Sequence, residues 1–374
     1  MKIEILKENI KNGLNVVEKA AGKNLSLPIL DNVLIGTEDS FLNLTSTDLE
    51  TTIRLWILTK IIKKGKLAVN LKFLSNFVSF LPNEKIIIDA KGQDISVECG
   101  SLKTEIRGFN AEDFPIIPEF KESEHLEIDN KRFCEGLSQV VNIASSSQSR
   151  PEISGIYFSF LKNTLKIAAT DSFRLAEKTI LLQNSTQKER SFILPQKPAR
   201  EIVNILDGKE GVLKIYFADN QTMFEFPMSE TNHPQLQITS RLIEGEYPNY
   251  GDIIPQNFKS SGVLKKDDFL NQIKTASLFA GKVNEVRISV NPSKNEVGIF
   301  SKNPDVGESR SNVASKIEGE PIEVSFNYKF LIDGLMNIKS SEVFLGVSKE
   351  EGPCILKPVG DASYLYVVMP IKSI

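Results

Sequence analysis

The sequence predicts an α+β fold made of three repeated domains, each with two helices packed on antiparallel sheets. Three observations support this: similar segments recur at a period of about 125–135 residues, short β-branched strands follow the helices, and proline-containing stretches separate the copies. Repeats of this length are whole domains and not solenoid units. Three like domains in one chain favour a pseudo-symmetric ring or arc.

An amphipathic helix lies near the start of each copy, within residues 5–22, 128–146 and 264–281. Apolar residues recur there at three- and four-residue steps, as Phe133 and Leu137 do in the second copy. We therefore expect one face of each helix to pack on a sheet.

A second, shorter helix is entered from a β-rich stretch, within residues 67–81, 192–206 and 323–338. Asn70, Pro195 and Asn327 open these helices and lie 125 and 132 residues apart. β-Branched and aromatic strands follow at 85–90, 213–218 and 342–347. Further strands that end in turns are expected at 42–50, 165–176 and 297–308.

Proline-containing linkers end the first two copies. Phe114 and Tyr247 each precede a proline and lie 133 residues apart. Because the residue before a proline is driven to extended conformations, these stretches are natural boundaries. We expect domains at 1–119, 120–250 and 251–374.

The composition is that of an ordinary globular protein, with 41% hydrophobic and 25% charged residues. No run of 18 apolar residues occurs, and acids interrupt the N-terminal segment where a signal peptide would be apolar. We expect a cytoplasmic protein without membrane association. Cys99, Cys134 and Cys354 lie far apart without a CxxC pair, so we expect reduced thiols and neither a metal site nor a cofactor.

Charge is distributed unevenly over the predicted elements. The chain has a net charge of -3, which by itself argues against a nucleic-acid partner. Each of the six predicted helices nevertheless carries a net charge of +1 or +2, together +7, which leaves -10 for the remainder. Since phosphate attraction depends on local potential, we favour a basic helical surface that faces phosphates.

Enzyme classes find little support. His125 and His233 have no carboxylate or second histidine at ligand spacing, which argues against a metal site or a catalytic triad. Asp48 and Asp171 recur in Thr-Asp pairs at strand ends, but residues 303–305 of the third copy read Asn-Pro-Asp. Thr-Asp is ordinary turn chemistry. We expect no enzymatic activity, and a repeat-built, metal-dependent nucleic-acid enzyme with Asp48 and Asp171 as ligands is the alternative.

Six short motifs are spread over the three repeats. They are LPILDNVLI (27–35), LTSTDLE (44–50), AEDFP (111–115), AATDSFRLA (168–176), SRLIEGEYPNY (240–250) and YVVMPIK (366–372). Each motif is weak alone, but their order and spacing across three repeats are specific. By these motifs the chain resembles the bacterial DNA polymerase III beta subunit, the replicative sliding clamp family, along its whole length.

The resemblance implies a head-to-tail dimer closed into a six-domain ring around duplex DNA, with helices lining the hole. Such a ring has no catalytic activity and tethers its partners to the template. The implied partners are double-stranded DNA without sequence preference, the DNA polymerase III alpha subunit, the clamp loader and other proteins with clamp-binding motifs. A trimeric clamp of the eukaryotic kind is disfavoured, because it uses two domains per chain.

DNA-facing candidates combine helix placement with the resemblance. Lys23, Lys72 and Lys197 match positions that are basic in the family, whereas Lys11 and Arg200 are chosen mainly for their helices. Arg150 and Gln148 belong to the polar loop 145–150, which the resemblance places near DNA.

The resemblance also implies an apolar groove for partner peptides between the second and third domains. Aliphatic and methionine side chains suit leucine or phenylalanine anchors, and an arginine suits backbone carbonyls or acids. The matched residues are Ile153, Thr170, Phe173, Arg174, Leu175, Pro248, Ile253, Val367, Met369, Pro370 and Ile371. Core packing is the alternative for Leu175 and Val367.

Three departures from the family concern this groove. Ser172 and Phe173 stand where Gly-His is common, and Asp252 replaces a basic residue. The chain ends in Ile-Lys-Ser-Ile at 371–374, unlike the usual Met/Val-Arg-Leu ending. The peptide preference is therefore expected to differ. For the dimer contact, we expect the edge segment 101–109, with Ile106 facing Leu278 of the neighbouring subunit.

Overall fold

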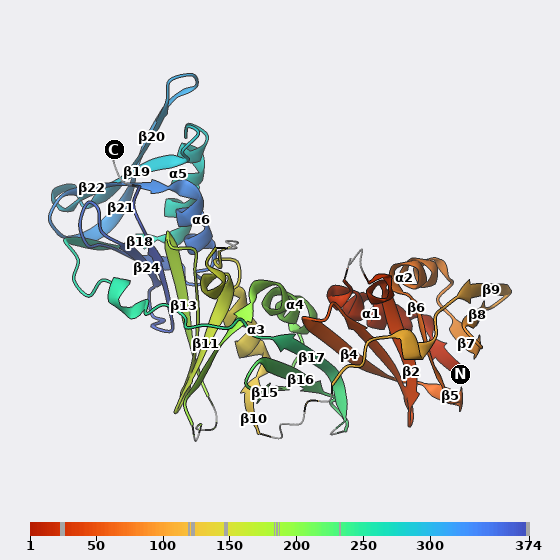
Figure 1. Cartoon of the computed structure of the whole chain (residues 1–374). Helices are drawn as coiled ribbons and strands as arrows, with labels where there is room; N and C mark the ends of the chain where they lie inside the picture. Colours follow the sequence, from red (N-terminus) through yellow and green to blue (C-terminus); the bar gives the residue numbers. More distant parts are fainter. Residues whose placement is uncertain are drawn as a thin grey trace. The chain divides into compact units, whose positions relative to one another are not determined.

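A computed structural model describes residues 1–22, 27–118, 120, 124–145, 149–182, 184, 186, 188–231 and 233–371 (Figure 1). Its contacts divide the chain into two compact units. The first unit comprises residues 1–134 and 201–242, and the second comprises residues 135–200 and 243–374. The division runs through the middle repeat, so a unit is not the same as a repeat.

The first unit contains two antiparallel sheets. The smaller has the order β5 (Lys60–Lys63), β1 (Lys2–Leu6), β7 (Lys85–Lys91), β8 (Asp94–Cys99), β9 (Leu102–Arg107). The larger has the order β10 (His125–Asp129), β15 (Val212–Phe217), β16 (Gln221–Pro227), β17 (Pro234–Arg241), β4 (Thr51–Leu58), β3 (Phe41–Thr47), β2 (Asn32–Glu38), β6 (Lys66–Asn70). The pairing of β17 with β4, with Ile238 opposite Ile53, joins the second repeat to the first.

The second unit contains one sheet of twelve antiparallel strands. Its order is β14 (Arg190–Pro195), β11 (Gly155–Leu161), β12 (Thr164–Thr170), β13 (Arg174–Leu181), β25 (Tyr364–Val368), β24 (Cys354–Pro358), β23 (Glu342–Val347), β18 (Ser260–Lys265), β21 (Gly307–Gly319), β20 (Glu296–Asn303), β19 (Glu285–Asn291), β22 (Ile322–Asn327). The pairing of β13 with β25, with Leu175 opposite Val367, joins the second repeat to the third.

The structure describes six α-helices, two for each repeat. They are α1 (Lys7–Val17), α2 (Leu71–Phe80), α3 (Asn130–Ser138), α4 (Gln196–Leu206), α5 (Lys266–Ser277) and α6 (Tyr328–Met336). Asn70 and Asn327 are the predicted helix openings, and their side chains accept hydrogen bonds from Phe73 N (2.9 Å) and Lys329 N (3.0 Å). These contacts satisfy amides in the first turns of α2 and α6.

Helices α1 and α3 pack on their sheets in the same way. Ile10 and Leu14 of α1 are fully buried, as are Phe133 and Leu137 of α3. A Cβ at Gly13 would lie 2.5 Å from Ile57 Cδ1, and one at Gly136 would lie 2.7 Å from Ile180 Cδ1. At both positions a side chain would press on an isoleucine of the sheet, and this shared close approach identifies the two helices as equivalent.

One predicted helix is too long. The amphipathic pattern extended the helix of the second repeat to residue 146, but α3 ends at Ser138. Turn hydrogen bonds follow, from Val140 N to Leu137 O and from Ile143 N to Val140 O. Val140 and Ile143 stay buried, at 0% and 1% exposure, so the apolar pattern continues after the helix has ended.

Candidate nucleic-acid and peptide interfaces

The helical charge is less uniform than the sequence predicted. Within their observed bounds, α1, α2, α3 and α4 each carry a net charge of +1. Helices α5 and α6 are neutral, because Lys265, Lys282 and Lys339 lie outside them. The expectation of six basic helices is therefore wrong for the third repeat.

The predicted DNA-facing residues are distributed over both units. Lys11 on α1 is half-buried, and Lys72 on α2 is exposed, as are Lys197 and Arg200 on α4. The exposed Arg150 contacts Glu152 at 3.2 Å and Ser172 Oγ at 3.3 Å, so part of its charge is compensated. Lys23 and Gln148 lie outside the described residues.

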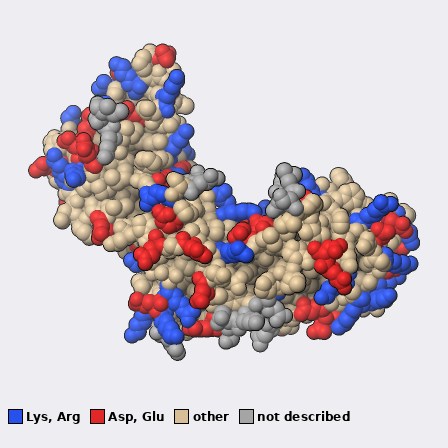
Figure 2. Space-filling model, in the orientation of Figure 1, with Lys and Arg blue, Asp and Glu red and all other residues tan. Residues whose placement is uncertain are grey.

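A further group of basic side chains, which the sequence prediction missed, lies on the five-stranded sheet. Figure 2 shows lysine and arginine gathered over β5 and β7 of the first unit. Lys60 and Lys85 share Glu4 at 3.0 and 3.1 Å, and Lys64 lies 3.6 Å from Asp39. β5 is an edge strand, and lysines there also discourage pairing with a foreign strand.

The turn between β12 and β13 brings the candidate groove residues together. Asp171 Oδ1 accepts hydrogen bonds of 3.0 Å from the amides of Phe173 and Arg174. Ser172 adopts φ +75°, a left-handed conformation that favours glycine. A glycine at this position would adopt the same conformation without strain.

The first repeat has the same turn. Asp48 Oδ1 accepts from the amides of Glu50 (3.1 Å) and Thr51 (2.7 Å), and Leu49 has φ +74°. Both Thr-Asp pairs thus serve as turn-forming groups. Among the described residues, no group of three His, Cys, Asp or Glu side chains is placed to hold a metal ion.

Arg174 is held within the protein. Its Nε lies 2.9 Å from Asp171 Oδ2, its Nη1 forms an ion pair with Asp333, and its guanidinium lies 4.6 Å from the centroid of Phe330. The side chain is only 12% exposed. Its charge is compensated by two carboxylates, which disfavours the predicted role in binding an acidic group.

Phe173 and the C-terminal residues form the exposed apolar part of the site. Phe173 is 61% exposed, and its ring stacks on Phe330 with centroids 6.3 Å apart. Met369 N donates to Phe173 O at 2.8 Å, and Ile371 N donates to Ser325 O at 2.8 Å. Two backbone hydrogen bonds therefore fix the half-buried stretch from Met369 to Ile371 beside the turn.

Other predicted groove residues belong to the core. Leu175 and Val367 are each 1% exposed and pack with Ile355, which the sequence prediction missed. Ile153 (2%) and Thr170 (7%) are also buried. Core packing, the alternative for Leu175 and Val367, is what the structure shows for their side chains.

The linker that covers this core supplies the remaining predicted residues. Tyr250 packs against the core, and its hydroxyl lies 2.6 Å from the buried Glu177. Burial, together with this carboxylate, raises the pKa of Tyr250, so the hydroxyl is the donor. Pro248 is half-buried, and Ile253 is 45% exposed. Tyr250 thus holds the linker while Ile253 remains accessible.

The two predicted interface residues differ in accessibility. β9 is an edge strand of its sheet, as expected, but Ile106 is only 6% exposed. The side chain of Ile106 packs mainly in its own sheet and leaves little surface for another subunit, so its contact with Leu278 stays a prediction. Leu102 (50%) and Phe109 (47%) are the apolar residues exposed at this edge, and Leu278 is 73% exposed.

Sequence comparison finds the DNA polymerase III beta subunit family in three successive parts. The N-terminal domain matches residues 1–118, the central domain 127–249 and the C-terminal domain 251–372. The beta sliding clamp of Synechococcus elongatus is 26% identical over 379 residues, with 100% of this chain and 99% of the relative covered. That of Bacillus subtilis is 26% identical over 385 residues, with both chains covered completely.

Solved structures agree. The sliding clamp of Bacillus subtilis superposes with a TM-score of 0.94 at 25% identity, over 100% of both chains. The DNA polymerase III beta subunit of Thermotoga maritima gives 0.91 at 26% identity, again over 100% of both. None of the described helices is long and apolar enough to cross a membrane. Domain matches in order along the chain, with full-length relatives, show that it belongs to the DNA polymerase III beta subunit family of sliding clamps.

Proposed function

We propose that two copies of this chain close head-to-tail into a ring that encircles duplex DNA and slides along it. The observation that carries this proposal is the threefold repetition of one module, together with the full-length match to sliding clamps. In this proposal the modules are bounded at residues 119 and 250. Lys11, Lys23, Lys72, Gln148, Arg150, Lys197 and Arg200 face the DNA.

A ring of this kind stays on DNA by topology and not by tight contacts. Four helices with a net charge of +1 each give weak, sequence-independent attraction to phosphates. Few direct contacts leave the ring free to move. The protein itself is proposed to be non-catalytic and cytoplasmic.

The surface around Phe173 and Met369 is proposed to bind peptides of the DNA polymerase III alpha subunit, the clamp loader and other partners. The exposed side chains of Phe173 and Ile253 and the half-buried Met369, Pro370 and Ile371 offer apolar contacts for a leucine or phenylalanine anchor. A tethered polymerase is held at a high effective concentration near the primer end.

Retention on circular DNA tests the proposal. After loading onto nicked circular duplex by a clamp loader, the protein should co-elute with the circle through gel filtration. A single cut that linearises the DNA should release it, because only topology holds it. Retention that is unchanged by linearisation would show ordinary DNA binding and refute encirclement.

A further inference from the structure

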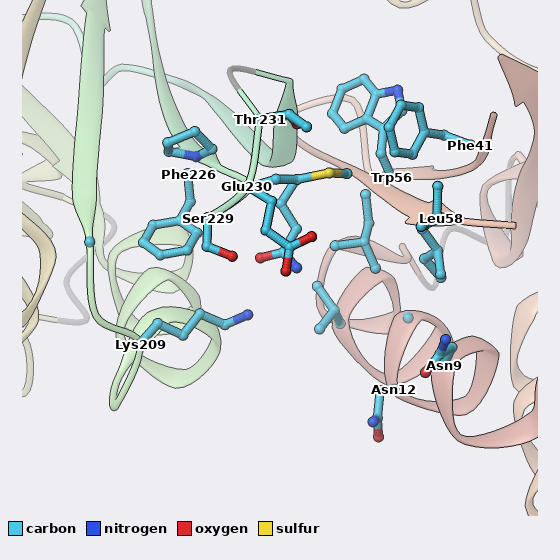
Figure 3. Close-up of a pocket in the computed structure, with 18 of the residues that line it drawn as sticks. Asn9, Asn12, Phe41, Trp56, Leu58, Lys209, Phe226, Ser229, Glu230 and Thr231 are labelled. Atoms are coloured by element: carbon cyan, nitrogen blue, oxygen red, sulfur yellow. The ribbon is translucent and has the colours of Figure 1, made fainter. Parts of the chain in front are cut away.

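A hollow of about 980 Å³ lies in the first unit between α1 and the segment that follows α4 (Figure 3). Its walls are mainly apolar and include Phe41, Trp56, Leu58 and Phe226. Figure 3 shows the side chain of Lys209 extending from the other wall into this space. None of the proposed groove residues lines it.

In the second unit the corresponding junction lies between α3 and the segment that follows α6. Direct polar contacts connect the two sides there. Gln139 of the α3 turn donates to the carbonyl oxygen of Asn337 at 2.6 Å. Lys339 forms an ion pair with Glu135 of α3 at 3.1 Å. Lys178 of β13 donates to Ser363 Oγ at 2.6 Å and lies 3.5 Å from Asp361.

Matching positions of the two junctions carry different residues. Lys209 and Lys339 are each the third residue after the second helix of their repeat. Glu135 is the sixth residue of α3, and the sixth residue of α1 is Asn12. The first unit therefore keeps the lysine and lacks its carboxylate.

The apolar character of the hollow has a similar origin. Lys178 is the fifth residue of β13, and the fifth residue of β4 is Leu55, which lines the hollow. In the first unit, the aliphatic Leu55 thus stands where the second unit has Lys178, whose ammonium reaches across the junction.

Lys209 is left in an unusual environment for a cation. Its ammonium lies 5.8 Å from the centroid of Phe226, and among the described residues no carboxylate forms an ion pair with it. Burial lowers the pKa of Lys209. A half-buried ammonium without a counter-ion is destabilising, and an entering carboxylate removes that cost.

We propose that this hollow is a second protein-docking site, which binds a peptide segment with a carboxylate side chain next to an aromatic or aliphatic one. The carboxylate pairs with Lys209, as Glu135 pairs with Lys339, and the apolar side chain packs against Phe41, Trp56 and Phe226. Glu210 and Glu230 also line the hollow, but both are exposed, so solvent screens their repulsion. The volume is at the upper end for a small-molecule site and suits an extended segment.

The sequence supplies a reporter, because Trp56 is the only tryptophan in the chain. An acetylated hexapeptide with phenylalanine between two glutamates should change Trp56 emission in the full-length protein in a saturable way. The counterpart with glutamine in place of glutamate should bind about tenfold more weakly, since it loses the charge-assisted contact.

Two variants test the role of Lys209. Asn12→Glu restores an internal partner and should weaken binding of the acidic hexapeptide about tenfold, and Lys209→Gln should do the same. Lys339→Gln is the matched control, because it removes the equivalent lysine at the bridged junction, and binding should be unchanged. Asn12 is exposed, so its variant is expected to fold.

Four results would overturn the proposal. These are no change in Trp56 emission up to millimolar acidic hexapeptide, equal affinity for the glutamine counterpart, unchanged binding by both Lys209→Gln and Asn12→Glu, or equally tight binding of free phenylacetate. The last result would identify a small-molecule site.

Discussion

The amide of Met369 donates a 2.8 Å hydrogen bond to the carbonyl oxygen of Phe173, which ties the C-terminal stretch to the turn after β12. This bond links two segments that are almost 200 residues apart in sequence, and it uses backbone atoms alone. The side chains of Met369 and Phe173 thus stay available for contacts with a partner, while their positions are fixed.

The double substitution Met369→Ala and Pro370→Ala should therefore remove peptide capture without affecting assembly. Loss of these apolar contacts is expected to weaken binding of a fluorescent leucine- and phenylalanine-containing peptide at least about tenfold, measured by polarisation. Native mass should be unchanged. Met336→Ala, at a 64% exposed position of α6, is the control and should bind normally. Equal affinities for all three proteins would place the groove elsewhere.

Ser172→Gly should stabilise the protein. Ser172 has φ +75°, which costs an L-residue about 1 kcal/mol relative to glycine. The change should raise the free energy of unfolding of the second unit by a similar amount, less the cost of greater freedom in the unfolded chain. Urea unfolding measures it. Ser172→Ala keeps the strained backbone and should not stabilise; if it stabilises as much as glycine, strain is not the cause.

The three thiols should be unreactive in the folded protein. Cys99, Cys134 and Cys354 are buried, and burial raises the pKa of Cys134 to about 12. At pH 8 a thiol reagent should modify none of them until urea unfolds the chain. Rapid modification of the native protein would contradict their burial.

The same shift makes stability depend on pH in the alkaline range. The folded pKa of Cys134 lies above the unfolded value of about 8.5. The contribution of the protonated thiol to the free energy of unfolding is therefore complete below pH 8.5 and is lost as the pH rises toward 12. Cys134→Ala should flatten the alkaline fall in unfolding free energy between these values. An identical pH profile for the variant would argue against this assignment.

Neutralising the helical cations should reduce the salt dependence of DNA binding. Glutamine at Lys11, Lys72, Lys197 and Arg200 removes up to four phosphate contacts, each worth a slope of about 0.9 in log K against log salt on duplex DNA. Glutamine at Lys63, Lys64, Lys66 and Lys91, which are exposed outside the helices, is the matched control. An unchanged slope in the helix variant, or an equal loss in the control, would remove the assignment.

Leu278→Arg should separate the proposed dimer. The wild-type protein is expected at twice 41.8 kDa, and the variant at 41.8 kDa, because a charge in an apolar contact is costly. Native mass spectrometry measures both. Met336→Arg introduces the same charge at another exposed apolar position and should remain dimeric. A dimeric Leu278→Arg protein would show that the contact does not use this residue.

Local patterns predicted most elements and missed contacts between distant residues. Helix starts were readable from Asn70 and Asn327 because capping acts within three residues. The end of α3 was not readable, since Val140 and Ile143 stay buried in the turns that follow. Arg174 and Asp333 lie 159 residues apart, and no local signal connects them.

Burial of the groove residues shows the same limit. The sequence pattern around Leu175 and Val367 fits a groove residue and a core residue equally well. Only their packing against Ile355 in the folded protein shows that they belong to the core. The hollow beside Trp56 could not be predicted from the sequence either. It is lined by Asn12 and Leu55, which within the described part of the chain make no polar contact like those of Glu135 and Lys178 at the matching positions of the second unit.

The pairings of β4 with β17 and of β13 with β25 have a consequence for attempts to shorten the protein. A fragment of residues 120–250 would have two unpaired edge strands, β17 and β13. Each would expose backbone amides and carbonyls that β4 and β25 satisfy in the whole chain. Such a fragment should precipitate or stack on itself when produced alone. A repeat can therefore be added or removed only if new strand pairings replace those of β4 with β17 and of β13 with β25.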